Sequence, residues 1–291
     1  MSVSSAVIIR NDPFIDWLQS MSYKIQELSL GGILDQAIKL VKNHFGLLFG
    51  IVALVYIPFN LAAAGYLTSV LPPVPGIEAS LEEQKAFQLA VADNLTITLA
   101  VGVFTALLIL PLSNAAITHA VAKLYLGKPT SVMESISVGF GRIIPLFLTS
   151  ILMGLAIMGG LILLIIPGIL FAFWFSLSTH AVVLEKMSGT TALKRSKALM
   201  SGNIGSVFVM GILLGVMNWG VRTVVGLIGQ PMAAMAIQVV LASIMTLLST
   251  AALVVFYFSC RCKLENFDLE HLADSMGEST QLDNVTSQDQ F

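Results

Sequence analysis

A stretch of 42 residues, from Ile143 to Leu184, contains no Asp, Glu, Lys or Arg, and it restricts the possible folds of this chain more than any other feature. A transmembrane helix needs about 20 apolar residues to cross a hydrocarbon core of about 30 Å. As one helix the stretch would be about 63 Å long at 1.5 Å per residue. The stretch must therefore reverse direction, and we expect the break at Pro167-Gly168, near its midpoint.

Composition extends this conclusion to the whole chain. Apolar residues make up 56% of the 291 residues and charged residues only 11%, whereas a soluble domain carries roughly 25% charged residues. A water-soluble monomer is excluded, because its surface would lack the charge that it needs. The sequence predicts an all-α polytopic membrane protein.

Six segments are long and apolar enough to serve as transmembrane helices. They are residues 45–69, 94–122, 143–166, 168–184, 204–228 and 233–259.

The distribution of basic residues supports an even number of spans. With six spans, thirteen Lys and Arg residues lie on one face of the membrane and Lys85 alone lies on the other, while Arg222 falls inside the fifth span. Cytoplasmic segments carry the excess of Lys and Arg in membrane proteins. We therefore expect a multi-pass protein of the cell (inner or plasma) membrane with both termini in the cytoplasm.

Short amphipathic segments precede the first, third and fifth spans, so we expect three helical hairpins, each preceded by a short cytoplasmic helix. Ser131 and Glu134 form a capping-box pattern at the start of the second of these helices. The third, 191–200, has Leu193 and Leu199 beside its basic residues. We expect these helices to lie in the interface, with apolar sides in the acyl chains. The alternative is that they pack on one another as a small cytoplasmic layer.

The chain divides into three regions by composition. Residues 1–28 are predicted as an N-terminal amphipathic helical segment, 29–271 as the six-span membrane domain and 272–291 as a disordered acidic tail. Residues 264–291 hold seven acids and no Lys or Arg, which leaves a formal net charge of +5 on residues 1–263.

The sequence predicts no catalytic, cofactor or metal site. The two cysteines, Cys260 and Cys262, point apart on a helix, and the four histidines have no Cys or His partner at metal-ligand spacing. No nucleophile elbow, phosphate-binding loop or dinucleotide fingerprint occurs. Acids and bases nearly cancel over the chain, so we expect no nucleic-acid partner.

Polar groups inside or at the end of spans are the candidate structural or pathway residues, because each is costly there. Asn218 and Arg222 are four residues apart and share one face of the fifth span. They either bond to other helices, with Arg222 extending to the headgroups, or line a polar pathway. Glu185 ends the fourth span, and we expect it to pair with a base from the helix that follows.

Lys194, Arg195 and Lys197 are the candidate contacts for anionic lipid, because three charges lie within four residues of a predicted interface helix. The alternative is that these residues only orient the protein during insertion.

Four segments resemble a known family: SLGGILDQA at 29–37, YIPFN at 56–60, the run from IPG at 166–168 through Trp174 and VVLE at 182–185 to TALKRS at 191–196, and RCKLENFDLE at 261–270. They are similar to the glycerophosphoryl diester phosphodiesterase membrane-domain family, which is related to six-span bacterial membrane proteins. The resemblance implies a six-span fold. In fused members the chemistry resides in a separate soluble domain with a His-Arg-Gly motif, and none of the four histidines here precedes Arg-Gly.

We therefore expect a non-enzymatic integral membrane protein whose partners are membrane lipids and which organises lipid, or a protein partner, at its cytoplasmic face. The first alternative is a transporter or channel for a small solute or a lipid-derived molecule, which would need discontinuous helices and a polar midplane site. The second is an embedded enzyme acting on lipid, which the absence of acid/base pairs in the sequence disfavours.

Overall fold

The computed structural model describes residues 23, 25–72, 75–76, 79–226 and 231–268, and all regular secondary structure in these residues is helical. The elements are α2 (Leu30–Asn43), α3 (Phe45–Val70), α4 (Leu81–Asp93), α5 (Leu95–Phe104), the π-helix η1 (Thr105–Ile109), α6 (Leu110–Tyr125), α7 (Val132–Gly141), α8 (Ile143–Leu163), α9 (Ile165–Trp174), α10 (Ser178–Leu184), α11 (Gly189–Met200), α12 (Ile204–Gly226) and α13 (Pro231–Glu265).

The predicted fold class is confirmed: the chain is an all-α polytopic membrane protein with six candidate spans. The spans are Phe45–Val70, Leu95–Tyr125, Ile143–Leu163, Ile165–Leu184, Ile204–Gly226 and Ala236–Glu265. Consecutive spans pack on each other, since α3 contacts α6, α8 contacts α9, and α12 contacts α13. The repeat of three hairpins and its cytoplasmic orientation stay predictions.

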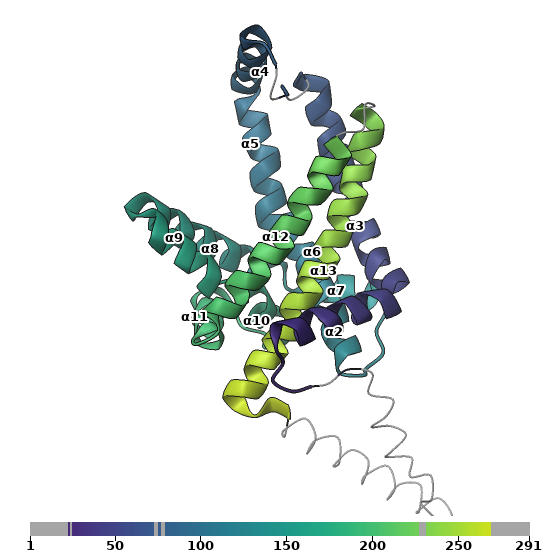
Figure 1. Cartoon of the computed structure of the whole chain (residues 1–291), viewed down its shortest axis with the longest axis vertical. Helices are drawn as coiled ribbons and strands as arrows, with labels where there is room; N and C mark the ends of the chain where they lie inside the picture. Colours follow the sequence, from purple (N-terminus) through teal and green to yellow (C-terminus); the bar gives the residue numbers. More distant parts are fainter. Residues whose placement is uncertain (1–22, 24, 73–74, 77–78, 227–230, 269–291) are drawn as a thin grey trace, which may run out of the picture.

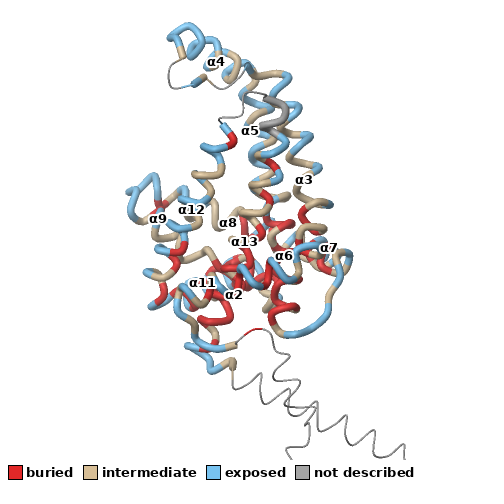
Figure 2. The backbone as a smooth tube through the Cα atoms, turned by 45° about the vertical axis from the view of Figure 1, so that its right-hand side comes forward, coloured by how far each residue is buried: buried red, intermediate tan, exposed pale blue. Residues whose placement is uncertain are grey.

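Helix α13 is the centre of the bundle. It packs against α2, α3, α6, α11 and α12, and it runs along the long axis of the molecule (Figure 1). Buried residues gather at one end, where α2, α6 and α11 surround the C-terminal half of α13, whereas α4 and α5 at the opposite end are largely exposed (Figure 2). The side chains of this core include Tyr257, Leu40, Ile117 and Leu199. The tightly packed part of the fold is therefore one end of the bundle.

Helices α2, α7 and α11 form a layer at this buried end, which we call the end layer. Each precedes a span, as the sequence predicts. The hydroxyl of Ser29 accepts a hydrogen bond from the Gly32 amide and so starts α2, and Ser131 accepts from the Glu134 amide at 3.2 Å and starts α7. The predicted start of α7 at Ser131 is thus confirmed.

Much of the apolar side of each of these helices faces protein, which corrects the expectation that these sides lie in acyl chains, although Ile38 of α2 and Met133 and Phe140 of α7 are exposed. Leu193 is 8% exposed and Leu199 is fully buried. In α2, Ile33 and Leu40 are buried, and in α7 Ile136 is buried. An amphipathic pattern shows that a helix has one apolar face but not what covers it. Here the spans cover the buried part of each face, since α2 packs on α13, α7 on α6, and α11 on α8, so the contacts are with the bundle rather than with one another as the alternative supposed.

The break in the long uncharged stretch lies before Pro167 rather than at it. Helix α8 ends at Leu163, Leu164 is extended, and α9 begins at Ile165. Proline is tolerated in the first turn of a helix, where its missing N–H has no helical partner. Gly168 instead allows a close crossing, because a Cβ on Gly160 would lie 2.8 Å from the Gly168 Cα.

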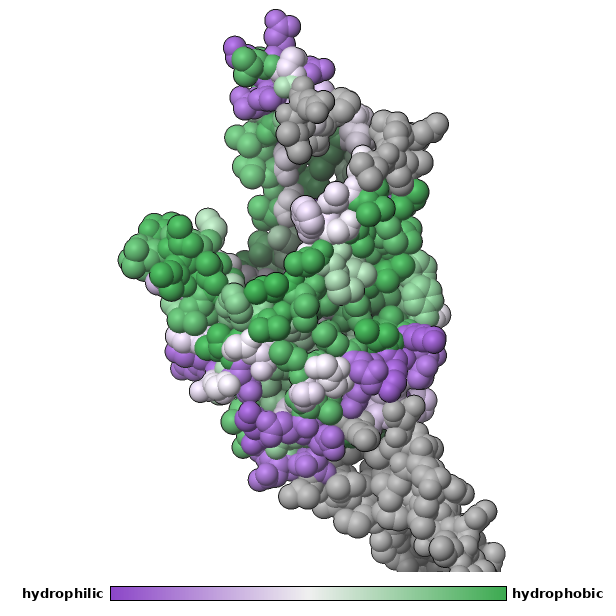
Figure 3. Space-filling model, in the orientation of Figure 1, coloured by the Kyte–Doolittle hydropathy of each residue, from purple (hydrophilic) through white to green (hydrophobic). Residues whose placement is uncertain are grey.

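The surface divides into hydrophilic ends and an apolar middle (Figure 3). Segment 71–93, between the first two spans, contains α4, which begins with a capping box between Ser80 and Glu83. Of the predicted N-terminal helical segment 1–28, only Tyr23 and residues 25–28 are described, and they are not helical. The predicted tail, 272–291, lies outside the described residues.

Candidate functional site

Helix α11 holds together the two halves of the interrupted fourth span. Helix α9 ends at Trp174 and α10 begins at Ser178, which leaves backbone groups at the break without helical partners. The buried Ser196 hydroxyl donates to the Trp174 carbonyl at 2.7 Å and accepts from the Leu177 amide at 3.1 Å. Lys197 lies over the Trp174 ring, 4.1 Å from its centroid. Side chains from a single turn of α11 therefore provide partners for the backbone groups at the break.

Glu185 and Arg195 form a largely buried ion pair, which confirms the predicted pairing of Glu185 with a base from the next helix. The Arg195 Nε lies 2.9 and 2.8 Å from the two carboxylate oxygens, and the side chains of Glu185 and Arg195 are 15% and 20% exposed. The reversal between α10 and α11 uses left-handed backbone at Lys186 (φ 57°) and Gly189 (φ 56°).

Helix α13 completes this cluster with residues that the spacing of charges did not predict. The Tyr257 hydroxyl donates to Glu185, and Arg195 also pairs with Glu265. Arg261 donates to the other oxygen of Glu265 at 2.9 Å. We call Glu185, Arg195, Tyr257, Arg261 and Glu265 the ion-pair network. It joins the end of the fourth span, the end layer and the end of the sixth span.

The ion-pair network is electrically balanced, with two guanidinium groups against two carboxylates. The carboxylates of Glu265 and then Glu185 raise the pKa of Arg195 above its ordinary value. Because Glu185 and Glu265 both bond its guanidinium group, Arg195 is held as a structural cation. Arg261 stacks over Phe267 at 4.1 Å, which anchors the end of α13.

A second ion pair joins α6 to α7. Lys123 donates to Glu134 at 2.5 Å, and Thr130 donates to the other carboxylate oxygen at 3.2 Å. The hydrogen bond from Lys123 holds the pKa of Glu134 below its usual range. The same carboxylate therefore does not complete the capping box with Ser131 but ties the end layer to the second span.

The three predicted lipid-contact residues make different contacts in the structure. Arg195 is engaged by two carboxylates, and Lys197 lies on Trp174. Lys194 is exposed and, within the described residues, has no carboxylate partner. The expected surface of three adjacent cations is therefore reduced to one free ammonium group and one held on an aromatic ring.

Asn218 and Arg222 are not part of the ion-pair network. They lie on α12, which runs away from the end layer (Figure 1). Asn218 is half-buried and Arg222 is exposed, four residues before Gly226, where the described helix ends.

Histidine and cysteine side chains form no metal centre in the described part of the chain, where no group of three or more His, Cys, Asp and Glu residues is placed to hold an ion. His180 is buried and stacks on Tyr257, with ring centroids 6.3 Å apart. Cys260 and Cys262 are buried free thiols.

A family model described as "Domain of unknown function (DUF8558)" matches residues 139–286. The match contains α8 to α13 and therefore every residue of the ion-pair network. Comparison with curated proteins and with solved structures gave no match. The resemblance to the glycerophosphoryl diester phosphodiesterase membrane-domain family stays a prediction.

Proposed function

We propose that this chain, which belongs to the family described as a domain of unknown function (DUF8558), is a non-enzymatic integral membrane protein that gathers anionic lipid headgroups at its end layer. The cell membrane, with the end layer in the cytoplasm, is the proposed location. The proposal is supported by the balance of charge at the end layer and by the use of polar groups within the spans.

The charge balance carries the proposal. Within the described residues at this end, the carboxylates with a basic partner are Glu27, Asp35, Glu134, Glu185 and Glu265. Asp268 is the one carboxylate there without such a partner. The bases left without a carboxylate are Lys42, Lys128, Arg142, Lys186, Lys194 and Lys197. Within the described residues at this end, pairing therefore occupies five of the six acids and leaves six bases around the membrane boundary, where each contributes about 1 kcal/mol near an anionic leaflet.

Several polar groups within the spans bond to their own helices, and Thr250 donates to Asn114 between α13 and α6 at 3.3 Å, which favours this proposal over a transporter or channel. The Asn60 amide donates to the Tyr56 carbonyl at 2.8 Å, and the Ser243 hydroxyl donates to the Val239 carbonyl at 2.6 Å. Thr105 makes the same kind of bond to Val101. Groups used in this way are not offered to a solute.

Removing two surplus charges should weaken lipid binding. The double variant Lys186→Gln/Lys194→Gln should bind phosphatidylglycerol about thirtyfold more weakly than the wild type, from about 1 kcal/mol for each charge. Native mass spectrometry of the purified protein, titrated with phosphatidylglycerol, measures the change. The control Asp35→Asn/Lys39→Gln removes an exposed ion pair at the same end with no change in net charge, and it should bind as the wild type does. Equal retention by all three proteins would contradict the proposal.

Cysteine labelling tests the orientation. In a background with Cys260 and Cys262 replaced by serine, the variant Ala79→Cys should react with an impermeant thiol reagent applied outside intact cells. Ser188→Cys, which lies in the exposed turn before α11, should react only after the cells are opened. Labelling of Ser188→Cys from outside would reverse the proposed orientation.

A further inference from the structure

The chain turns back towards the bundle where helix α13 ends. Asn266, which follows α13, has left-handed backbone (φ 54°), a conformation that commonly ends a helix. The Phe267 ring then packs on the ring of Phe258, an earlier residue of α13, with centroids 5.5 Å apart. Asp268, the last described residue, lies beside Cys262 of the same helix. The sequence after Asp268 therefore starts alongside α13, at the level of the end layer.

Within the described residues, three lysines near this point have no carboxylate partner. Arg195 of α11 bonds Glu265 at the end of α13, so these two helices are in contact there. Lys194 and Lys197 are the neighbouring bases on α11, and Lys186 lies in the turn before it. All three residues are exposed. We call Lys186, Lys194 and Lys197 the α11 lysines.

The sequence after Asp268 carries the opposite charge. Residues 269–291 contain no Lys or Arg and five acids, which are Glu270, Asp274, Glu278, Asp283 and Asp289. An extended chain spans up to about 3.4 Å per residue, so Glu278 has a reach of up to about 34 Å from Asp268. Because the segment is covalently attached, its effective concentration at the α11 lysines is on the order of millimolar. Charge, reach and attachment all favour contact with these lysines.

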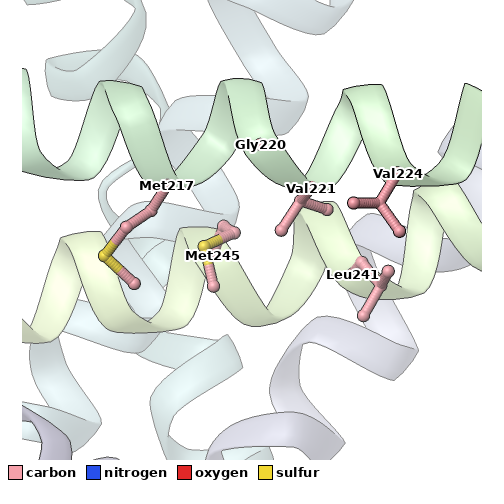
Figure 4. Close-up of a pocket in the computed structure, with 6 residues that line it drawn as sticks. All are labelled: Met217, Gly220, Val221, Val224, Leu241 and Met245. Atoms are coloured by element: carbon pink, nitrogen blue, oxygen red, sulfur yellow. The ribbon is translucent and has the colours of Figure 1, made fainter.

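The other half of the bundle offers this acidic segment little to bind. Away from the end layer, the described bases are Lys85 on α4 and Arg222 on α12. The pocket between α12 and α13 contains no polar side chain (Figure 4), since its lining residues are Met217, Gly220, Val221, Val224, Leu241 and Met245. A carboxylate placed there would lose its hydration without gaining a partner. Charge complementarity therefore favours the α11 lysines as the place where the segment binds.

We propose that the acidic segment 269–291 binds the α11 lysines and competes there with anionic lipid headgroups. This inference rests on the proposed function and adds its regulation. The segment and a headgroup are both anions that need the same lysines, so anionic lipid displaces the segment, whereas uncharged lipid leaves it bound. Exposed ion pairs are individually weak, which keeps the segment displaceable.

Carbodiimide crosslinking, which joins a carboxylate directly to a lysine amine, tests this contact on the full-length protein in detergent. Mass spectrometry of the crosslinked monomer should find the acids of 269–291 joined to the α11 lysines at least about tenfold more often than to Lys85, an exposed lysine at the opposite end of the bundle. Added phosphatidylglycerol should reduce these crosslinks, and phosphatidylcholine, which has no net charge, should not. Crosslinks that are as frequent at Lys85, or that phosphatidylglycerol leaves unchanged, would overturn the proposal.

Removing acids from the segment should strengthen lipid binding. Glu270→Gln/Asp274→Asn should bind phosphatidylglycerol about fivefold more tightly than the wild type in the native mass spectrometry titration, because two competing charges are lost. The matched control Glu82→Gln/Asp93→Asn makes the same change in net charge at exposed positions of α4, and it should bind as the wild type does. An equal gain in the control would indicate a general effect of charge and would contradict the competition.

The lysine variant separates a failure of this inference from a failure of the proposed function. If Glu270→Gln/Asp274→Asn binds phosphatidylglycerol as the wild type does while Lys186→Gln/Lys194→Gln binds it more weakly, the competition is refuted and the proposed function stands. If neither variant changes the affinity, the proposed function fails and the competition fails with it.

Discussion

Replacing Glu185 with alanine should lower the free energy of unfolding by about 3 kcal/mol, the lower end of the range for removing one partner of a buried pair. Both side chains of the Glu185–Arg195 pair are largely buried, so the loss is not screened by solvent as it is at a surface. Arg195 keeps Glu265 as a partner, which limits the loss, while the Tyr257 hydroxyl loses its acceptor. Reversible unfolding in detergent, followed by circular dichroism, measures the change.

Two further variants make this result specific. Glu185→Gln keeps an oxygen that accepts from Tyr257 and Arg195 but carries no charge, so it should be less destabilising than Glu185→Ala. Asp35→Ala removes one partner of the exposed pair with Lys39, whose side chains are 59% and 61% exposed, and should change stability by less than about 1 kcal/mol. If Glu185→Ala and Asp35→Ala were equally stable, the ion-pair network would have no structural role.

The number of spans was predictable because it depends on the mean hydropathy of helix-length segments and on the charges that flank them. An apolar segment of sufficient length has to cross or leave the membrane, and the basic residues at its ends restrict the orientation. The Glu185–Arg195 pair was predictable for a related reason, since only ten residues and a Ser-Gly turn separate the two side chains. Both predictions depend on local sequence.

The Arg261–Glu265 pair is local, at i,i+4 on α13, but the contacts of α13 with Glu185 and Arg195 were not predictable from charge spacing, because they join residues far apart in the chain. Glu265 is 70 residues from Arg195, and Tyr257 is 72 residues from Glu185. Glu265 and Arg261 lie within the closing segment of the family resemblance, which was the one signal that marked them. Neither the charge spacing nor the family resemblance indicates which helix Glu265 and Arg261 contact.

In the end layer, too, the sequence pattern indicates an apolar face but does not indicate what that face contacts. Leu193 and Leu199 have the spacing of an apolar face, and a bilayer or a protein core satisfies such a face equally well. The deciding feature is Ser196 on the same buried side, whose hydroxyl bonds the backbone of the interrupted fourth span rather than a carbonyl of its own helix. A polar residue within an apolar stripe was the available sign of protein contact.

Ser196→Ala should therefore lower the free energy of unfolding by about 2 kcal/mol. The substitution leaves the Leu177 amide and the Trp174 carbonyl without their side-chain partner, and an unsatisfied buried group costs about 1–3 kcal/mol. The better helix propensity of alanine offsets about 0.5 kcal/mol of this loss. Thr190→Ala, an exposed substitution on the same helix, should change stability by no more than about 0.5 kcal/mol.

Hydrogen exchange locates the effect at the break itself. In the wild type the Leu177 amide donates to a buried hydroxyl, so it should exchange slowly; in Ser196→Ala it should exchange faster, while amides in the core of α13 change less. Ser196→Cys, whose thiol is a weaker donor and acceptor, should fall between the wild type and Ser196→Ala in both stability and exchange. Unchanged exchange at Leu177 in Ser196→Ala would mean that the two halves of the fourth span are held by apolar packing alone, because the backbone groups at the break would then not depend on the hydroxyl.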